Sequence, residues 1–218
     1  MTSGSAAPAG RRWLWDLLSS QDEATARMQE PVRQLATEHL GLRTGLTVLD
    51  AGCGSGGNLG ALRTSVGAQG RVVGIDFSPK MVRRAHERIE ANGWANVEVR
   101  GGDLTTDRLD HDAFDAALAT FALSATSDVR AAVENVHQAL RPGGRLFVCD
   151  LRLVPAGRSA AVIWLAGLCY RWVAGWRGLD VLDQLQATFD TTEVVGSLRP
   201  WPPVIVAVAT KLAAAPTP

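Results

Sequence analysis

The stretch VLDAGCGSGGNLGAL, Val48 to Leu62, decides the fold. Its first residues are a continuous apolar run, which is typical of a β-strand buried on both faces. A turn rich in glycine follows, and a helix is expected from about Asn58. Glycines let a backbone approach a ligand closely, and the first N–H groups of a helix favour an anion. The stretch therefore predicts a strand, a ligand-binding turn and a helix.

Strands and helices alternate along the rest of the chain. Strands are expected at 46–51, 71–76, 97–102, 114–120, 144–150, 192–197 and 204–210. Helices are expected at 12–19, 31–40, from about 58, at 79–92 after the N-cap Ser78, at 129–140 and at 156–177. This alternation builds a parallel sheet with helices on both faces. The sequence predicts an α/β, doubly wound, mostly parallel seven-stranded sheet with a short N-terminal helical cap.

The length of 218 residues fits one domain with a sizeable core. We expect a disordered tail at 1–10 and a single domain at 11–213. Within it, 11–45 would form the cap helices and 155–180 a helical segment resembling a lid.

Charge, cysteines and hydropathy exclude several classes of protein. Lys and Arg together number 22, as do Asp and Glu, so net charge gives no reason to expect a nucleic-acid partner. The three cysteines have no metal-binding spacing and no secretory signal precedes them, which favours the cytoplasm. The most apolar stretch, Ala160 to Trp176, is interrupted by Arg171, and a transmembrane helix needs about 20 apolar residues. No transmembrane segment is expected.

Three aspartates follow or end three successive strands. The glycine spacing alone fits a dinucleotide, but Asp50 would then face a negatively charged pyrophosphate. A carboxylate there suits a cationic ligand without phosphates, such as S-adenosylmethionine. Asp76 ends the second strand and can accept hydrogen bonds from both ribose hydroxyls, in either kind of site. Asp103 follows the third strand, where it can accept a hydrogen bond from an adenine amino group. Together these carboxylates favour the sulfonium ligand.

The chain resembles the class I S-adenosylmethionine-dependent methyltransferases, which have a Rossmann-like fold, in particular small bacterial quinone, phospholipid and small-molecule methyltransferases. The segments that carry the resemblance are VLDAGCGSGG, VVGIDFSPKMV, GGDL, FDAALATFALS and ALRPGGRLFVCD. It implies methyl transfer to a small-molecule or lipid-like acceptor, with S-adenosylhomocysteine as product. It also implies that the cofactor is bound by Asp50, Gly52, Cys53, Gly54, Gly56, Asn58, Asp76, Phe77, Met81, Gly102, Asp103, Leu104, Thr120 and Phe121.

The sequence assigns no catalytic base and no metal ligand. Methyl transfer from a sulfonium is an in-line displacement, which needs a base only where the acceptor must lose a proton early. The four histidines, His39, His86, His111 and His137, lie away from the carboxyl ends of the expected strands.

Tryptophans suggest an apolar, aromatic acceptor pocket, whose candidate residues are Trp13, Trp15, Ser124, Asp150, Trp164 and Tyr170. They also suit a peripheral membrane contact, or simply pack helices onto the core, and these alternatives stay open. Two other functions stay open as well. One is a non-methylating enzyme or binding protein that uses the same cofactor, for example a cyclase, and the other is an NAD(P) oxidoreductase. The oligomeric state is open between a monomer and a homodimer.

Overall fold

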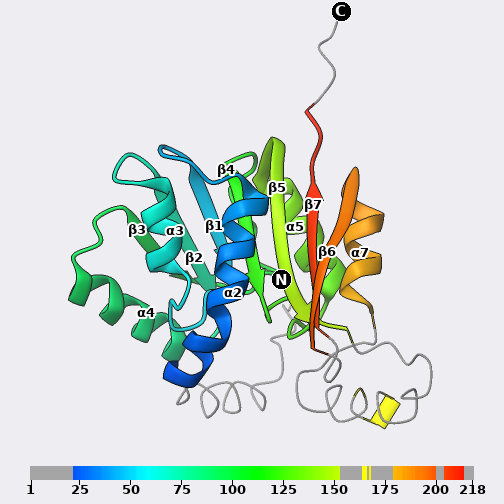
Figure 1. Cartoon of the computed structure of the whole chain (residues 1–218), viewed down its shortest axis with the longest axis horizontal. Helices are drawn as coiled ribbons and strands as arrows, with labels where there is room; N and C mark the ends of the chain where they lie inside the picture. The colour runs from blue at the N-terminus through cyan, green and yellow to red at the C-terminus, as the bar shows by residue number, and fades with distance from the viewer. Residues whose placement is uncertain (1–21, 153–163, 166, 168–178, 200–203, 214–218) are drawn as a thin grey trace, which may run out of the picture.

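The computed structural model describes residues 22–152, 164–165, 167, 179–199 and 204–213 (Figure 1). These residues form a seven-stranded sheet in the order β3-β2-β1-β4-β5-β7-β6. The strand β7 runs antiparallel to both of its neighbours, β5 and β6, and the other neighbouring strands pair in parallel. The bounds are β1 Thr47–Ala51, β2 Arg71–Asp76, β3 Val97–Gly101, β4 Phe114–Thr120, β5 Leu140–Leu151, β6 Thr191–Arg199 and β7 Val204–Thr210. The predicted α/β fold with a mostly parallel seven-stranded sheet is confirmed.

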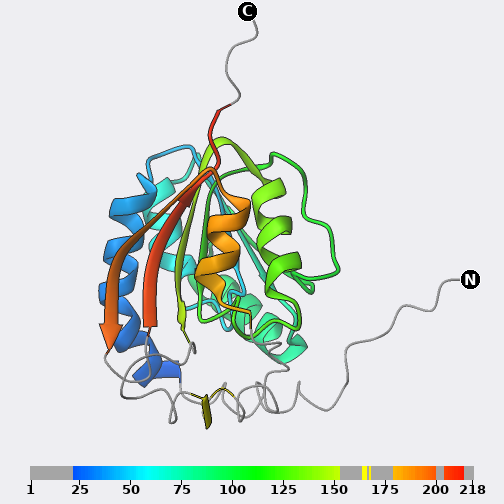
Figure 2. The ribbon, with the colours of Figure 1, turned by 90° about the vertical axis from the view of Figure 1, so that its right-hand side faces the viewer.

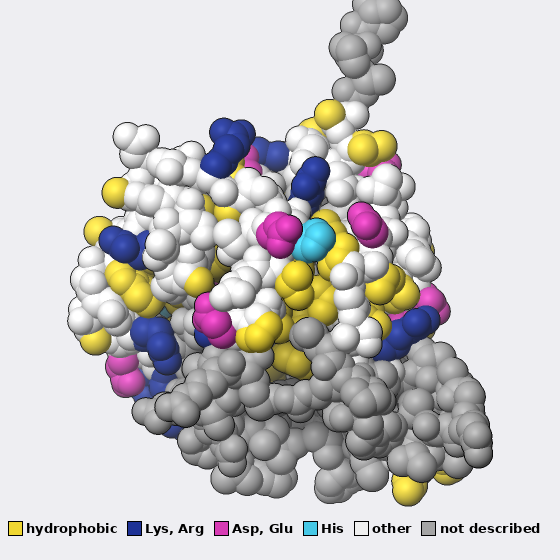
Figure 3. Space-filling view, in the orientation of Figure 1, with side chains coloured by type: hydrophobic (Ala, Val, Ile, Leu, Met, Phe, Trp, Pro, Cys, Tyr) yellow, Lys and Arg dark blue, Asp and Glu magenta, His cyan; other side chains and the backbone are white. Residues whose placement is uncertain are grey.

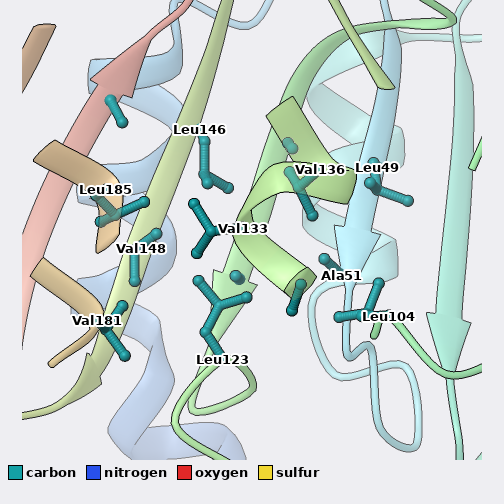
Figure 4. Close-up of a cluster of buried hydrophobic side chains, with 14 of the residues drawn as sticks. Leu49, Ala51, Leu104, Leu123, Val133, Val136, Leu146, Val148, Val181 and Leu185 are labelled. Atoms are coloured by element: carbon teal, nitrogen blue, oxygen red, sulfur yellow. The ribbon is translucent and has the colours of Figure 1, made fainter. Parts of the chain in front are cut away.

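Helices cover both faces of the sheet (Figure 2). One face carries α2 (Asp22–Leu40), α3 (Leu59–Val66) and α4 (Pro79–Asn92), and the other carries α5 (Val129–Ala139) and α7 (Val181–Thr188). Two separate apolar clusters result, one under each layer of helices. In Figure 4, Val133 and Val136 of α5 face Leu49 and Leu146 of the sheet.

Side-chain caps fix where three of the helices begin. The Ser78 hydroxyl accepts a hydrogen bond from Met81 N (3.3 Å) at the start of α4, and Gly93 ends that helix in the left-handed conformation at φ 62°. Asp128 and Asp180 cap α5 and α7 in the same way as Ser78 caps α4. Each cap satisfies one of the N–H groups that a helix leaves without an intrahelical partner. The predicted Ser78 cap is confirmed.

The structure differs from the sequence prediction at three elements. The helix α7 was not expected, because its eight residues are too short for a clear apolar period. The helix α2 begins at Asp22 rather than at Pro31, and it continues through that proline while Val32, Ala36 and Leu40 pack on the sheet. The strand β5 begins at Leu140 rather than at Gly144.

A bulge explains the early start of β5. Leu140 pairs with Phe114, but the next pair joins Arg145 to Ala116, so the Pro-Gly-Gly segment lies outside the regular register. Gly143 has a φ of 85°, and its N–H donates to Lys211 O (2.7 Å) beyond β7.

The tail 1–10 and the expected helix 12–19 lie outside the described residues. Of the expected helix 156–177, only 164, 165 and 167 are described, and they are helical.

Candidate functional site

The site lies at the carboxyl edge of the sheet, where the strand order reverses. The strand β1 pairs with β2 on one side and with β4 on the other, so the crossovers diverge at this point. Ligands of open parallel sheets bind in the crevice that such a switch creates. The glycine turn after β1 occupies this position, with the ends of β2 and β4 on either side and the end of β3 beyond β2.

The glycine turn needs its glycines for two separate reasons. Gly52, Gly54 and Gly56 have φ values of 75°, 55° and 83°, a region that favours glycine. A Cβ on Gly52 would also lie 2.4 Å from the Cβ of Ala122, which follows β4. The turn is therefore pressed against the segment after β4, and no side chain fits between them.

Hydrogen bonds from two other elements fix the turn. The Asp76 carboxylate at the end of β2 accepts from Gly54 N (2.9 Å) through Oδ2 and from Ser78 N (2.9 Å) through Oδ1. From α4, Arg88 Nε donates to Ser55 O (3.1 Å). Asp76 thus organises the turn itself, which the sequence did not suggest. Nothing in the sequence around Arg88 indicates its contact, which the packing of α4 creates.

Asp50 is a buried carboxylate without a hydrogen-bond donor. It is 0% exposed, and neither oxygen has a donor at hydrogen-bond distance within the described part of the chain. The nearby Asn58 amide influences the pKa of Asp50, but its Nδ2 donates a hydrogen bond to Thr120 Oγ1 (3.1 Å). The other polar atom of this amide, Asn58 Oδ1, also lacks a donor. Burial raises the pKa of Asp50 to about 7, which the Asn58 amide partly opposes and the charge of Asp76 reinforces. Buried acceptors without donors are costly, so this group of atoms suits a cationic donor.

We expect stability to depend on the pH through Asp50. In the folded state the Asp50 carboxyl group keeps its proton up to about pH 7, whereas a free Asp side chain loses its proton near pH 3.8. The folded state therefore binds more protons between these values, and the contribution of Asp50 to stability falls as the pH rises through this window. The full loss is at most about 4 kcal/mol. Urea unfolding of the wild type and of Asp50→Asn at pH 4.5 and pH 8 measures it. A stability difference between the two proteins that does not change with pH would contradict this expectation.

Three candidate residues follow β3 at the carboxyl edge of the sheet. Gly102 N donates to Asp76 O (3.0 Å), which brings this segment against the end of β2. Asp103 is half-buried, and its Oδ1 accepts from both Thr105 N (2.9 Å) and Thr105 Oγ1 (2.7 Å). Leu104 is buried in the core cluster under α5. The structure therefore brings Asp103 to the same edge as Asp76, as predicted.

Cys53, Phe77 and Met81 differ in how far they are accessible. Cys53 is buried against Gly74, where a Cβ would lie 2.8 Å from its sulfur. Burial, followed by the charges of Asp50 and Asp76, raises the pKa of this thiol well above its usual value, so the side chain serves packing. Phe77 and Met81 are half-buried at the β2–α4 junction, beside the turn.

The end of β4 carries a strained aromatic residue. Phe121 has a φ of 52° and is 39% exposed, and its N–H donates to Cys149 O (2.8 Å). A bulky residue in this conformation is uncommon and is found where the surroundings impose it. The close approach of Gly52 to Ala122 is such a constraint.

Two acceptor-pocket candidates, Ser124 and Asp150, contact each other in the interior. Ser124 N and Oγ donate to the Asp150 carboxylate at 3.0 Å and 2.5 Å, and Leu151 N donates to it at 2.8 Å. Both residues are buried, and burial raises the pKa of Asp150. In this arrangement Ser124 and Asp150 fix the turn after β4 and do not present polar groups to an acceptor. Trp164 is 60% exposed, and Trp13, Trp15 and Tyr170 lie outside the described residues.

Other kinds of site find no support in the described residues. No group of His, Cys, Asp and Glu among them could hold a metal ion. None of the helices in the described ranges is long and apolar enough to cross a membrane. On the face shown in Figure 3, basic and acidic side chains of these residues are interspersed rather than gathered in a patch of one sign. His137 stands edge-on to Phe189, with ring centroids 4.9 Å apart, on the α5–α7 side.

Comparisons with known proteins point to one family. Residues 48–144 match the model of the family described as "Methyltransferase domain". The demethylmenaquinone methyltransferase of Lactococcus lactis is 32% identical over 117 residues, 54% of this chain and 46% of that protein. The chain spans about half the length, or less, of the curated relatives it matches.

Solved structures share the fold. The geranyl diphosphate C-methyltransferase of Streptomyces coelicolor, solved with S-adenosyl-L-homocysteine, is similar with a TM-score of 0.66 and 16% identity, over 85% of this chain and 81% of that one. The cyclase SpnF is similar with a TM-score of 0.67 and 21% identity, over 84% and 81%. At these identities the likeness shows the fold alone. The strand order, the glycine turn at its switch point and the family match agree, and residues 48–144 of this chain resemble the class I S-adenosylmethionine-dependent methyltransferases.

Proposed function

We propose that this chain transfers a methyl group from S-adenosylmethionine to a small-molecule or lipid-like acceptor. The observation that carries the proposal is the buried Asp50 carboxylate, which lacks a donor beside a glycine turn that leaves no room for a side chain at Gly52. A phosphate-bearing ligand would bring negative charge toward this carboxylate. A ligand with an ammonium group and no phosphate would instead supply the missing donors.

The residues present fit the cofactor. Asp50 and Asn58 Oδ1 together offer acceptors for the ammonium of its amino-acid part. Asp76 accepts two backbone N–H groups, and a carboxylate has lone pairs left for ribose hydroxyls. Asp103 would accept from the adenine amino group, while Phe77 and Leu104 would contact the ring. Gly52, Gly54, Gly56, Met81, Gly102, Thr120 and Phe121 would complete the walls.

The cofactor, when bound, supplies an activated methyl group on a sulfonium. The chain contributes alignment and a site without bulk water, since an in-line displacement depends on the approach of acceptor to methyl. The closely packed turn and the Asn58–Thr120 hydrogen bond hold the floor of the site in one geometry. We assign no base, and the acceptor determines whether one is needed.

Titration calorimetry tests the proposal. The purified chain should bind S-adenosylmethionine and S-adenosylhomocysteine with micromolar affinity, and bind NAD far more weakly. Asp76→Ala should lose this binding, whereas Glu87→Ala, which removes an exposed carboxylate paired with Arg83, should retain it. A panel of quinols, phenols and amines with a labelled methyl donor then identifies the acceptor. A folded, ligand-free wild type that binds neither sulfur ligand would refute the proposal. Cofactor binding with conversion of an acceptor but no labelled product would favour the non-methylating alternative.

A further inference from the structure

The loop between β3 and β4, residues 102–113, has no helix or strand of its own. It carries Asp103 and Leu104, which the proposed function assigns to the adenine end of the cofactor. A cavity of about 100 Å³ lies between this loop and the sheet, lined by residues of β2 and by the start of β4. Apolar packing beneath the loop is therefore incomplete, and polar contacts must contribute to its position.

One side chain, Asn135 of α5, makes three hydrogen bonds to the backbone of this loop. Its Nδ2 donates to Leu104 O (2.9 Å) and to Asp107 O (2.8 Å), and its Oδ1 accepts from Leu109 N (3.2 Å). The amide thus uses both donors and its acceptor on points spread along the loop. No pattern in the sequence indicates this role, because the contacts join segments far apart along the chain.

The first part of the loop is also bonded to itself. Asp103 N donates to Asp107 Oδ2 (2.9 Å), and Asp107 N donates back to Asp103 O (2.8 Å). A segment closed in this way moves as one unit. Asn135 bonds to the carbonyl groups of Leu104 and Asp107, which belong to that unit, and so it fixes the unit to α5.

We propose that Asn135 is a positioning residue of the cofactor site, which sets the place of Asp103 and Leu104 by holding the loop 102–113 from α5. This inference rests on the proposed function. Without the Asn135 amide, the loop would be free to move over the cavity, and the Asp103 carboxylate would no longer be held for the adenine amino group. The loss of binding energy would concern the adenine end of the ligand, because Asp50, Asn58 and the glycine turn lie on other elements.

The test compares Asn135→Ala and Asn135→Asp with the wild type. Alanine favours a helix more than asparagine does, so α5 itself is not weakened. Aspartate keeps the shape and the acceptor but replaces both donors with oxygen facing two carbonyl groups. Gln138→Ala, at an exposed position of the same helix, is the matched control. Calorimetry measures the affinity for S-adenosylhomocysteine and for S-inosylhomocysteine, in which oxygen replaces the adenine amino group. Hydrogen exchange measures the loop in ligand-free protein.

Asn135→Ala should weaken S-adenosylhomocysteine binding about tenfold, in keeping with the loss of positioning hydrogen bonds. Its preference for the amino over the oxo ligand should shrink, loop exchange should accelerate, and Asn135→Asp should bind no better. A general loss of stability would lower the affinity for both ligands alike and leave the ratio of the two affinities unchanged. If Asn135→Ala showed the same affinity ratio and the same hydrogen exchange in the loop 102–113 as the wild type, this inference alone would be overturned. Failure of the wild type to bind S-adenosylhomocysteine would overturn the proposed function together with it.

Discussion

Asp50→Asn should bind S-adenosylhomocysteine at least about 100-fold more weakly than the wild type at pH 8, while unfolding at a higher urea concentration. The proposed ligand ammonium would lose its buried counter-charge, and breaking a buried ion pair costs about 3–5 kcal/mol. The ligand-free protein, in contrast, would no longer ionise a carboxyl group that is 0% exposed and lacks a donor. With a wild-type pKa of about 7, this relief is on the order of 2–4 kcal/mol at pH 8.

Asp115→Asn is the matched control for this experiment. Asp115 is a carboxylate at the opposite edge of the sheet, where it accepts from Thr47 N (2.7 Å) and pairs with Arg141 (2.5 Å). Its replacement should lower stability and leave binding unchanged, the reverse of the result for Asp50. Weakened binding in both variants, or a destabilised Asp50→Asn that still binds, would show that Asp50 is a structural residue.

Gly52→Ala should lower the free energy of unfolding by about 3 kcal/mol or more. Two costs combine at this position: a backbone at φ 75°, and a Cβ that would lie 2.4 Å from the Cβ of Ala122. At this chain length, such a loss corresponds to a fall in Tm of roughly 6–12 °C. Ligand binding should fall as well, because relief of the clash would separate the glycine turn from the segment after β4.

Gly54→Ala separates the two costs. Its φ of 55° is also in the left-handed region, but nothing lies within 4 Å of the added Cβ. We expect a loss of about 1 kcal/mol, the conformational cost alone. Urea unfolding of both variants measures the difference. Equal losses at the two positions would mean that the contact with Ala122 is readily relieved.

The sequence predicts the sheet and its carboxyl edge well because their signals are local. Apolar runs mark β1 and β2, and the Ser78–Pro79 pair marks the start of α4. The glycine turn and Asp50 could be placed at the switch point from the order of strands and helices alone. The position of Asp103 followed in the same way from the end of β3.

What the sequence could not provide are contacts between distant segments. Asn135 and Arg88 bond to loops far from them along the chain, and only the packing of α5 and α4 makes them neighbours. Cys53 was predicted in the cofactor site, but the space that Gly74 leaves on β2 places its side chain in the interior. Burial likewise changes how Ser124 and Asp150 are interpreted, since their hydrogen bonds to each other were not visible in the sequence.

The antiparallel strand β7 has a consequence for synthesis on the ribosome. It follows β6 along the chain, yet it lies inside the sheet, between β5 and β6, and pairs with β5 from Arg145–Thr210 to Leu151–Val204. Until residues 204–210 leave the exit tunnel, one side of β5 has no partner, although its residues 146–150 are buried in the finished fold. A nascent chain that stalls before this point would expose an apolar strand edge, which is a site for aggregation.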